Sequence, residues 1–216
     1  MEGRFIHNLY RDGTRLQYFK TICQIAKQHG GSCTIRPLIS RLLLEAAHLN
    51  ELVDSGRIGS ETTANDYIEN TIAFGLGRRT GNRFQLGSLG KALVCVESTD
   101  KASLTTEEKA ILLACYLRHD FDALVRLLSF LRDIRPVSIT DIAEKYWSDI
   151  FHETPLIHLR KASRLHRTIP RLEWYADLGI VEKIDNKYTL SERAETLLRS
   201  NEEMTPLDMS FSYYFP

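Results

Sequence analysis

Two stretches of the chain that lie 104 residues apart repeat one pattern. Residues 82–94 read NRFQLGSLGKALV and residues 186–198 read NKYTLSERAETLL. Each has Asn, a cation, an aromatic residue, a polar residue and Leu, followed by a segment that ends in two aliphatic residues. The same offset pairs Gly75 with Gly179. Two copies are too few for a solenoid, which needs about three repeats to bury a continuous face.

The duplication therefore predicts two similar domains in a chain of 216 residues. We expect the first over residues 1–98 and the second over residues 99–200, followed by a C-terminal tail over residues 201–216. Thr105 and Glu108 have capping-box spacing ahead of an amphipathic pattern, so an extra helix over about 105–119 is expected to open the second domain.

Both copies carry the same order of signals: helix, short strand, helix, helix, two-stranded hairpin, helix. Thr62 or Thr63 is expected to cap the third helix of the first copy. Thr168 is expected to cap its counterpart, with Pro170 in the first turn. This is the order of a winged helix-turn-helix, in which the hairpin is the wing and the helix before it can enter a DNA groove. The predicted fold is mainly α with small β-hairpin wings, arranged as two tandem winged-helix domains.

Composition excludes several classes of protein. Lys plus Arg equals Asp plus Glu at 28 each, so no global charge attracts nucleic acid or an acidic membrane. The four cysteines form no CxxC pair, and no apolar run reaches the length of about 18 residues that a membrane span needs. We expect a cytoplasmic protein that does not contact membranes.

No catalytic or metal-binding pattern is convincing. Asp100, Glu107 and Lys109 have the spacing of a metal-dependent nuclease motif, but they fall across a loop and a helix start rather than on adjacent strands. His152 and His158 lack a third ligand at suitable spacing. The expectation is a protein that is not an enzyme, with no metal and no cofactor.

The two copies differ in charge at one equivalent position, the approach to the third helix. In the first copy this segment is acidic. In the second copy it holds a cluster of cations that leads into the predicted recognition helix: Arg160, Lys161, Arg164, Arg167 and Arg171. Such a cluster suits a phosphate backbone, and the helix dipole adds to it. The alternative is a solvated basic face that pairs with the domain's own acidic residues.

The wing of the first copy is also basic. Arg78, Arg79 and Arg83 flank its tip, whereas the second wing balances Glu182 and Asp185 against two lysines. A basic wing can contact the DNA backbone or insert an arginine into the minor groove. The predicted partner is therefore double-stranded DNA, with eight candidate contacts: Arg78, Arg79, Arg83, Arg160, Lys161, Arg164, Arg167 and Arg171.

The segment LEWYADLGIVEKIDNKYTLSERAETLL, residues 172–198, resembles the helix, wing and closing segment of tandem winged-helix proteins. In spacing it is similar to the multi-winged-helix recognition regions of type IIS restriction endonucleases, in which a separate domain cuts DNA. This resemblance implies a non-catalytic duplex-DNA-binding protein, either the recognition subunit of a prokaryotic defence or restriction-like system or a transcription regulator.

Two other functions stay open. Paired winged-helix domains also serve as scaffold or adaptor subunits of larger complexes, for example of the chromosome-condensation type, and a balanced charge suits that use. The aromatic tail MTPLDMSFSYYFP, residues 204–216, either docks on the chain itself or binds a protein partner or a second copy. A weaker alternative is a regulator that binds a small effector between the domains.

Overall fold

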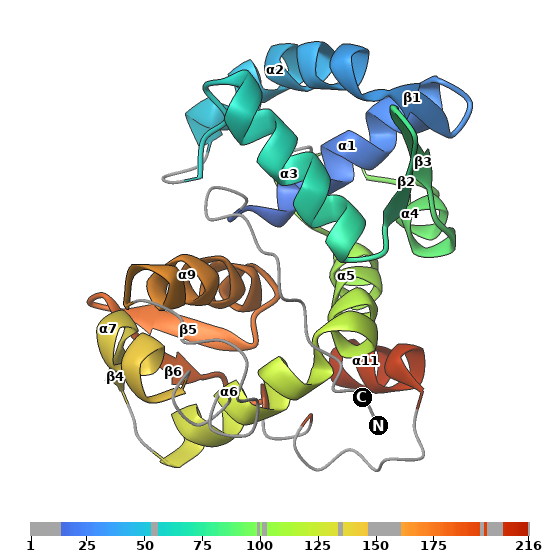
Figure 1. The fold of residues 1–216 in the computed structure, drawn as a ribbon. Coiled ribbons are helices and arrows are strands. Elements are labelled where there is room, and N and C mark those ends of the chain that lie inside the picture. The colour runs from blue at the N-terminus through green and yellow to red at the C-terminus, as the bar shows by residue number, and fades with distance from the viewer. Residues whose placement is uncertain are drawn as a thin grey trace.

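The computed structural model describes residues 14–52, 56–98, 100, 103–133, 136–146, 161–194, 197 and 205–215. These residues form a mainly α-helical fold with two small antiparallel sheets, so the predicted fold class is confirmed. Figure 1 shows one sheet at the right of the upper half and the other at the left of the lower half, with α5 running between the halves.

The first half begins with α1, which ends where two glycines with positive φ, Gly30 and Gly31, turn the chain. Its three-stranded sheet has the order β1-β3-β2. The bounds of its elements are α1 (Leu16–Gln28), β1 (Ser32–Thr34), α2 (Ile35–Leu52), α3 (Glu61–Ala73), β2 (Gly77–Thr80), β3 (Arg83–Leu86) and α4 (Ser88–Leu93).

After one additional helix, α5, the described part of the second half repeats this plan as far as its two-stranded hairpin. Its sheet has the matching order β4-β6-β5. The bounds of its described elements are α5 (Thr106–His119), α6 (Phe121–Asp133), β4 (Val137–Ser138), α7 (Ile139–Asp141), the π-helix η1 (Ile142–Tyr146), α9 (Lys161–Asp177), β5 (Val181–Ile184), β6 (Lys187–Leu190) and α11 (Pro206–Tyr214).

Equivalent residues shape the two halves. Gly75 with φ of +70° and Gly179 with φ of +71° follow α3 and α9 in the left-handed conformation that glycine favours. Phe84 of β3 and Tyr188 of β6 point into the core, as period-two alternation predicts. The described elements of the two halves thus follow one order up to the second hairpin, while the tandem winged-helix arrangement and the domain boundary at residue 98 stay predictions.

Some helix starts follow the local signals and others do not. The capping box is confirmed, because the Thr105 backbone N–H donates to Glu108 Oε2 at 2.9 Å and the Glu108 N–H donates to Thr105 Oγ1 at 3.2 Å. The predicted cap of α3 is wrong: the Ser60 hydroxyl accepts from the Thr63 N–H instead. Thr168 is also not a cap, because α9 already begins at Lys161 and encloses Pro170.

An aromatic cluster joins the two halves. The Trp174 ring of α9 lies 4.6 Å from the Phe74 ring and 5.8 Å from the Phe19 ring, both in the first half, measured between centroids. The Tyr116 ring of α5 lies 5.6 Å from the same indole. All four side chains are buried, so the halves share one continuous core.

The tail docks on the chain's own second half. Its helix α11 packs against α5 (Figure 1), and the Tyr213 and Tyr214 hydroxyls donate to the Gly179 and Leu178 carbonyl oxygens at 2.9 and 2.6 Å. Leu207, Phe211 and Phe215 stay on the outer side and are 42 to 46% exposed. None of the described helices combines the length and the apolar character that crossing a membrane demands.

Candidate nucleic-acid interface

The predicted basic cluster at α9 is placed only in part. Arg160 lies outside the described residues, and the structure describes the backbone but not the side chains of Lys161 and Arg164, which stand in the first turns of α9. Arg167 is partly exposed, and Arg171 is completely buried. The N-terminal part of α9 is therefore the region in which this cluster can meet a ligand.

Arg171 does not belong to that surface. Its Nε donates to Asp120 Oδ2 at 2.7 Å and its Nη2 donates to Asp120 Oδ1 at 3.0 Å, and neither side chain has exposed surface. Nη1 donates to the Arg167 carbonyl oxygen at 3.0 Å. The prediction that Arg171 contacts DNA is thus wrong, because its guanidinium fastens α9 to the corner between α5 and α6.

Arg167 has a free donor beside this pair. Its Nη1 is buried and has no hydrogen-bond partner among the described residues. Burial, and secondly the positive charge of Arg171, lower the pKa of the Arg167 guanidinium. A buried N–H donor without an acceptor is unfavourable, so an anion at this point would be stabilised.

The outer side of α9 is covered toward its C-terminal end. Arg15, which precedes α1, places Nη1 3.1 Å from Asp177 Oδ1 and Nη2 3.5 Å from Glu173 Oε2. The Leu16 backbone N–H also donates to Asp177 Oδ2, at 3.2 Å. The first half thus occupies positions near the C-terminal end of α9, whereas His166, nearer the N-terminal end, is exposed.

The first sheet separates its three arginines onto two faces. Arg79 pairs in register with the buried Phe84, and its guanidinium forms an ion pair with Glu69 of α3. The second half keeps this arrangement: Lys183 pairs in register with Tyr188, and its Nζ lies 3.3 Å from Glu173 Oε1 of α9. Since both halves form this strand-to-helix ion pair, it belongs to the shared fold, and DNA binding by Arg79 stays an untested prediction.

Arg78 and Arg83 lie on the opposite, solvent-facing side of the sheet. Strand alternation and the strand register place six polar side chains there, which we call the sheet-one face: Ser32, Thr34, Arg78, Thr80, Arg83 and Gln85. Arg78 Nε donates to Gln85 Oε1 at 2.9 Å, and Arg83 Nε donates to Ser32 Oγ at 3.0 Å. Neutral neighbours therefore hold both guanidiniums.

The described residues show no metal-binding cluster of three or more His, Cys, Asp or Glu side chains. Of the nuclease-like trio, Asp100 accepts a hydrogen bond from the Ser103 hydroxyl at 2.6 Å, and Glu107 stands in the first turn of α5. His152 and His158 lie outside the described residues. The absence of an enzymatic activity stays a prediction.

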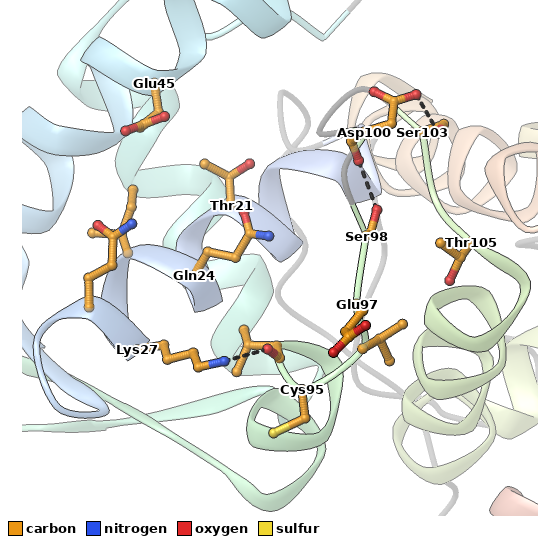
Figure 2. A pocket seen from close by; sticks show the side chains of 14 residues that line it. Thr21, Gln24, Lys27, Glu45, Cys95, Glu97, Ser98, Asp100, Ser103 and Thr105 are labelled. Carbon is orange, nitrogen blue, oxygen red and sulfur yellow. Dashed lines mark hydrogen bonds between the residues drawn. The ribbon is translucent and has the colours of Figure 1, made fainter.

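A cavity of about 1000 Å³ lies beside α1, under the connector that leads from α4 to α5. Thr21 and Gln24 of α1 face Ser98 of the connector across it (Figure 2). Lys20 and Lys27 fasten the connector, since Lys27 Nζ donates to the Val94 carbonyl oxygen at 2.8 Å and Lys20 Nζ donates to Ser98 Oγ at 3.0 Å. These contacts hold the connector on α1, and we assign the cavity no ligand.

The chain matches no protein-family model and none of the curated proteins. Among solved structures it is similar to the restriction endonuclease FokI, with a TM-score of 0.47 and 14% sequence identity over 68% of this chain and 32% of that one. The chain thus spans about a third of the length of that structure.

Proposed function

We propose that the chain binds duplex DNA and does not cut it. One observation supports this most directly: the first turns of α9 carry Lys161, Arg164, His166 and Arg167, and no acidic residue occurs on α9 before Glu173. The helix precedes a two-stranded hairpin, which is the position of the groove-entering helix in a winged helix. The positive end of the helix dipole adds to the cations in favouring a phosphate.

The equivalent helix of the first half has the opposite character. The N-terminal part of α3 carries Glu61 and Asp66, both at least partly exposed, and phosphates would repel them. A difference between two halves that share one fold is not required by that fold. We therefore assign the groove-entering role to α9 and not to α3.

Fluorescence anisotropy with a duplex of random sequence, titrated across a salt series, tests the proposal. The parent chain is expected to bind, with log affinity falling linearly against log salt by about 0.9 per neutralised phosphate. A Lys161→Ala, Arg164→Ala, Arg167→Ala variant that leaves three phosphates without a cation should flatten this slope by roughly 2.7. The control variant is Arg132→Ala, which removes an exposed cation of α6 and should leave the slope unchanged.

The proposal also states that the protein does not cut DNA, and a separate experiment tests this. Purified chain incubated with plasmid and Mg²⁺ or Mn²⁺ should leave the plasmid intact. Metal-dependent nicking that disappears in a Glu107→Ala variant would refute it. In this proposal the chain supplies recognition to a restriction-like defence system or acts as a transcription regulator.

The exposed apolar side of α11 favours a second candidate, a scaffold that binds another protein. Exposed apolar patches of this kind mark interaction surfaces, and Leu207, Phe211 and Phe215 form one at the end of the chain. A scaffold has no need to bind phosphate. If the parent chain fails to bind duplex DNA even at the lowest salt, the scaffold function replaces the first proposal.

A further inference from the structure

The sheet-one face has unused hydrogen-bond donors. Arg78 bonds through Nε alone, so neither of its Nη groups has a partner within the described part of the chain. Arg83 uses Nε on Ser32 Oγ and Nη2 on the Ser32 carbonyl oxygen, at 3.0 and 3.2 Å, which leaves Nη1. Both side chains are exposed. Each guanidinium is thus fixed at one edge and offers the other edge to solvent.

No acidic side chain neutralises this face in the part of the chain that the structure describes. Among the three arginines of the first sheet, Arg79 forms an ion pair, whereas Arg78 and Arg83 form none with the described residues. The other four members of the face are uncharged: Ser32, Thr34, Thr80 and Gln85. Two positive charges therefore stand together without compensation.

The second sheet supplies a comparison inside the same molecule. Its register places Glu182 where the first sheet has Arg78 and Lys187 where it has Arg83. Ile184, which is 53% exposed, takes the place of Thr80. The sheet architecture therefore tolerates either charge at the Arg78 position, and the doubly positive face is a property of the first sheet alone.

The spacing of the two arginines fits an extended polyanion. Arg78 lies opposite Gln85, and Arg83 is two residues from Gln85 on β3, so the arginines are diagonal neighbours. Such neighbours are about 7–8 Å apart. Their guanidiniums are held by two neighbours on adjacent strands, Gln85 on β3 and Ser32 on β1, on an exposed sheet face that an extended phosphate backbone can reach.

We propose that the sheet-one face binds the phosphodiester backbone of DNA. Arg78 and Arg83 donate to non-bridging phosphate oxygens, and Gln85 and Ser32 are positioning residues that hold the two guanidiniums. This inference rests on the proposed function and adds a second contact surface to it. It also moves the contact from the wing tip to the whole face, including β1, and leaves Arg79 to its ion pair with Glu69.

The central experiment compares charge-removing variants in matched positions. An Arg78→Gln, Arg83→Gln variant should flatten the salt dependence by about 1.8, or 0.9 for each phosphate that is no longer neutralised, and should weaken binding equally on unrelated sequences. Lys187→Gln removes the cation at the equivalent position of the second sheet and should leave the slope unchanged. Circular dichroism and thermal unfolding verify that each variant is folded.

A Ser32→Ala variant tests the positioning role. It keeps both arginines but removes the hydroxyl that holds Arg83 Nε. We expect weaker binding with an unchanged salt slope, because the number of cations is unchanged while the guanidinium is no longer held in one orientation. Thr34→Val is the control, since it removes another hydroxyl from the same face, at the position opposite Arg83. If Ser32→Ala binds as tightly as the parent, Ser32 has no positioning role.

The outcomes separate this inference from the proposed function. If the double arginine variant keeps the parent's affinity and slope while the α9 variant does not, the sheet-one face is not a contact surface and the proposed function stands. If the double arginine variant alone weakens binding, the face is supported and the role of α9 fails. A parent chain that does not bind DNA overturns both.

Discussion

Arg171 and Asp120 form an ion pair with no exposed surface on either side chain. Two charges withdrawn from water are costly to bury, and the mutual hydrogen bonds offset that cost only while both partners are present. The Asp120 backbone also contributes, because its carbonyl oxygen accepts from the Leu124 N–H at the start of α6. This residue pair therefore ties α9 to the corner between α5 and α6.

Removing one member of this pair should destabilise the protein strongly. We expect Asp120→Ala to lower the free energy of unfolding by about 3–5 kcal/mol, because Arg171 is left charged and buried without this counter-ion. Urea denaturation measures the loss. A double variant, Asp120→Ala with Arg171→Met, removes the stranded charge and should be more stable than Asp120→Ala. Equal stability of the single variant and the parent would contradict this account.

The pKa of His119 gives an expectation for how the stability of the protein depends on pH. Burial, and secondly the charge of Arg118, lower the pKa of His119, while Asp120 acts in the opposite direction. With its folded pKa below the ordinary value of about 6.5, His119 binds a proton more readily in the unfolded chain. Stability should therefore be complete above about pH 6.5 and decrease as the pH falls below it.

Thermal unfolding between about pH 7.5 and pH 5 measures this effect, since that interval spans the ordinary pKa of histidine. A His119→Gln variant should lose less stability than the parent over that interval. His48→Gln, which replaces an exposed histidine of α2, serves as the control and should follow the parent. If the His119 and His48 variants show the same pH dependence, His119 is not responsible.

At the scale of elements, the turn after the third helix of each half offers a paired experiment. Gly75 and Gly179 have nearly the same positive φ, so Ala at either position should cost about 1–2 kcal/mol of backbone strain. At Gly75 an added Cβ would also lie 2.3 Å from His119 Nε2, whereas at Gly179 none of the described residues offers an atom within 4 Å. Gly75→Ala should therefore destabilise by about 1–3 kcal/mol more than Gly179→Ala.

Chemical denaturation of the two variants under identical conditions gives this difference directly. A Gly75→Ala, His119→Ala double variant removes the imidazole that the new methyl group would meet and should recover part of the gap. Indistinguishable Gly75→Ala and Gly179→Ala variants would mean that His119 moves aside without cost.

The elements that could be predicted from sequence are those whose signals are local. Thr105 and Glu108 are three residues apart, and each hairpin strand reveals its buried face by alternation. The predictions that failed concern residues whose placement depends on contacts distant in the sequence. Pro170 is typical of a helix start, yet α9 accommodates it in its interior. The burial of Arg171 depends on Asp120, a partner 51 residues away, so its charge alone suggests a surface role.

The candidate site also has residues that the sequence identifies and residues that only the structure identifies. Comparison of the two copies identifies the basic wing of the first half, and the structure adds that only Arg78 and Arg83 of its arginines share the solvent-facing side. Ser32 and Gln85 could not be predicted from the sequence, because a polar residue in a short strand has no sequence feature that marks it as part of a site. Strand pairing, which the hairpin fixes only for β2 and β3, is needed to bring Ser32 of β1 beside Arg83.

On the scale of the whole molecule, Trp174 links the two halves. It is completely buried and contacts Phe19 and Phe74 of the first half. Trp174→Ala should lower the free energy of unfolding by about 3–5 kcal/mol through the cavity that it leaves. Because both halves contribute to this core, the parent should unfold in one transition and the variant should separate into two.

Calorimetry distinguishes these cases through the ratio of calorimetric to van't Hoff enthalpy, which is one for a single cooperative transition. Val96→Ala, a change in the partly buried connector, is the control and should keep a single transition. A Trp174→Ala protein that still unfolds in one step would show that other contacts couple the halves.

The position of α11 has a consequence for synthesis on the ribosome. Tyr213 and Tyr214 donate hydrogen bonds to the carbonyl oxygens of Gly179 and Leu178, and their helix covers one side of α5. The residues of α5 are made far earlier in translation than those of α11. Until residues 206–214 leave the exit tunnel, that side of α5 faces solvent, and a chaperone can bind it. The second half therefore completes its fold only after residues 206–214 have been made, whereas residues 14–98 contain every strand of the first sheet and can begin to pack sooner.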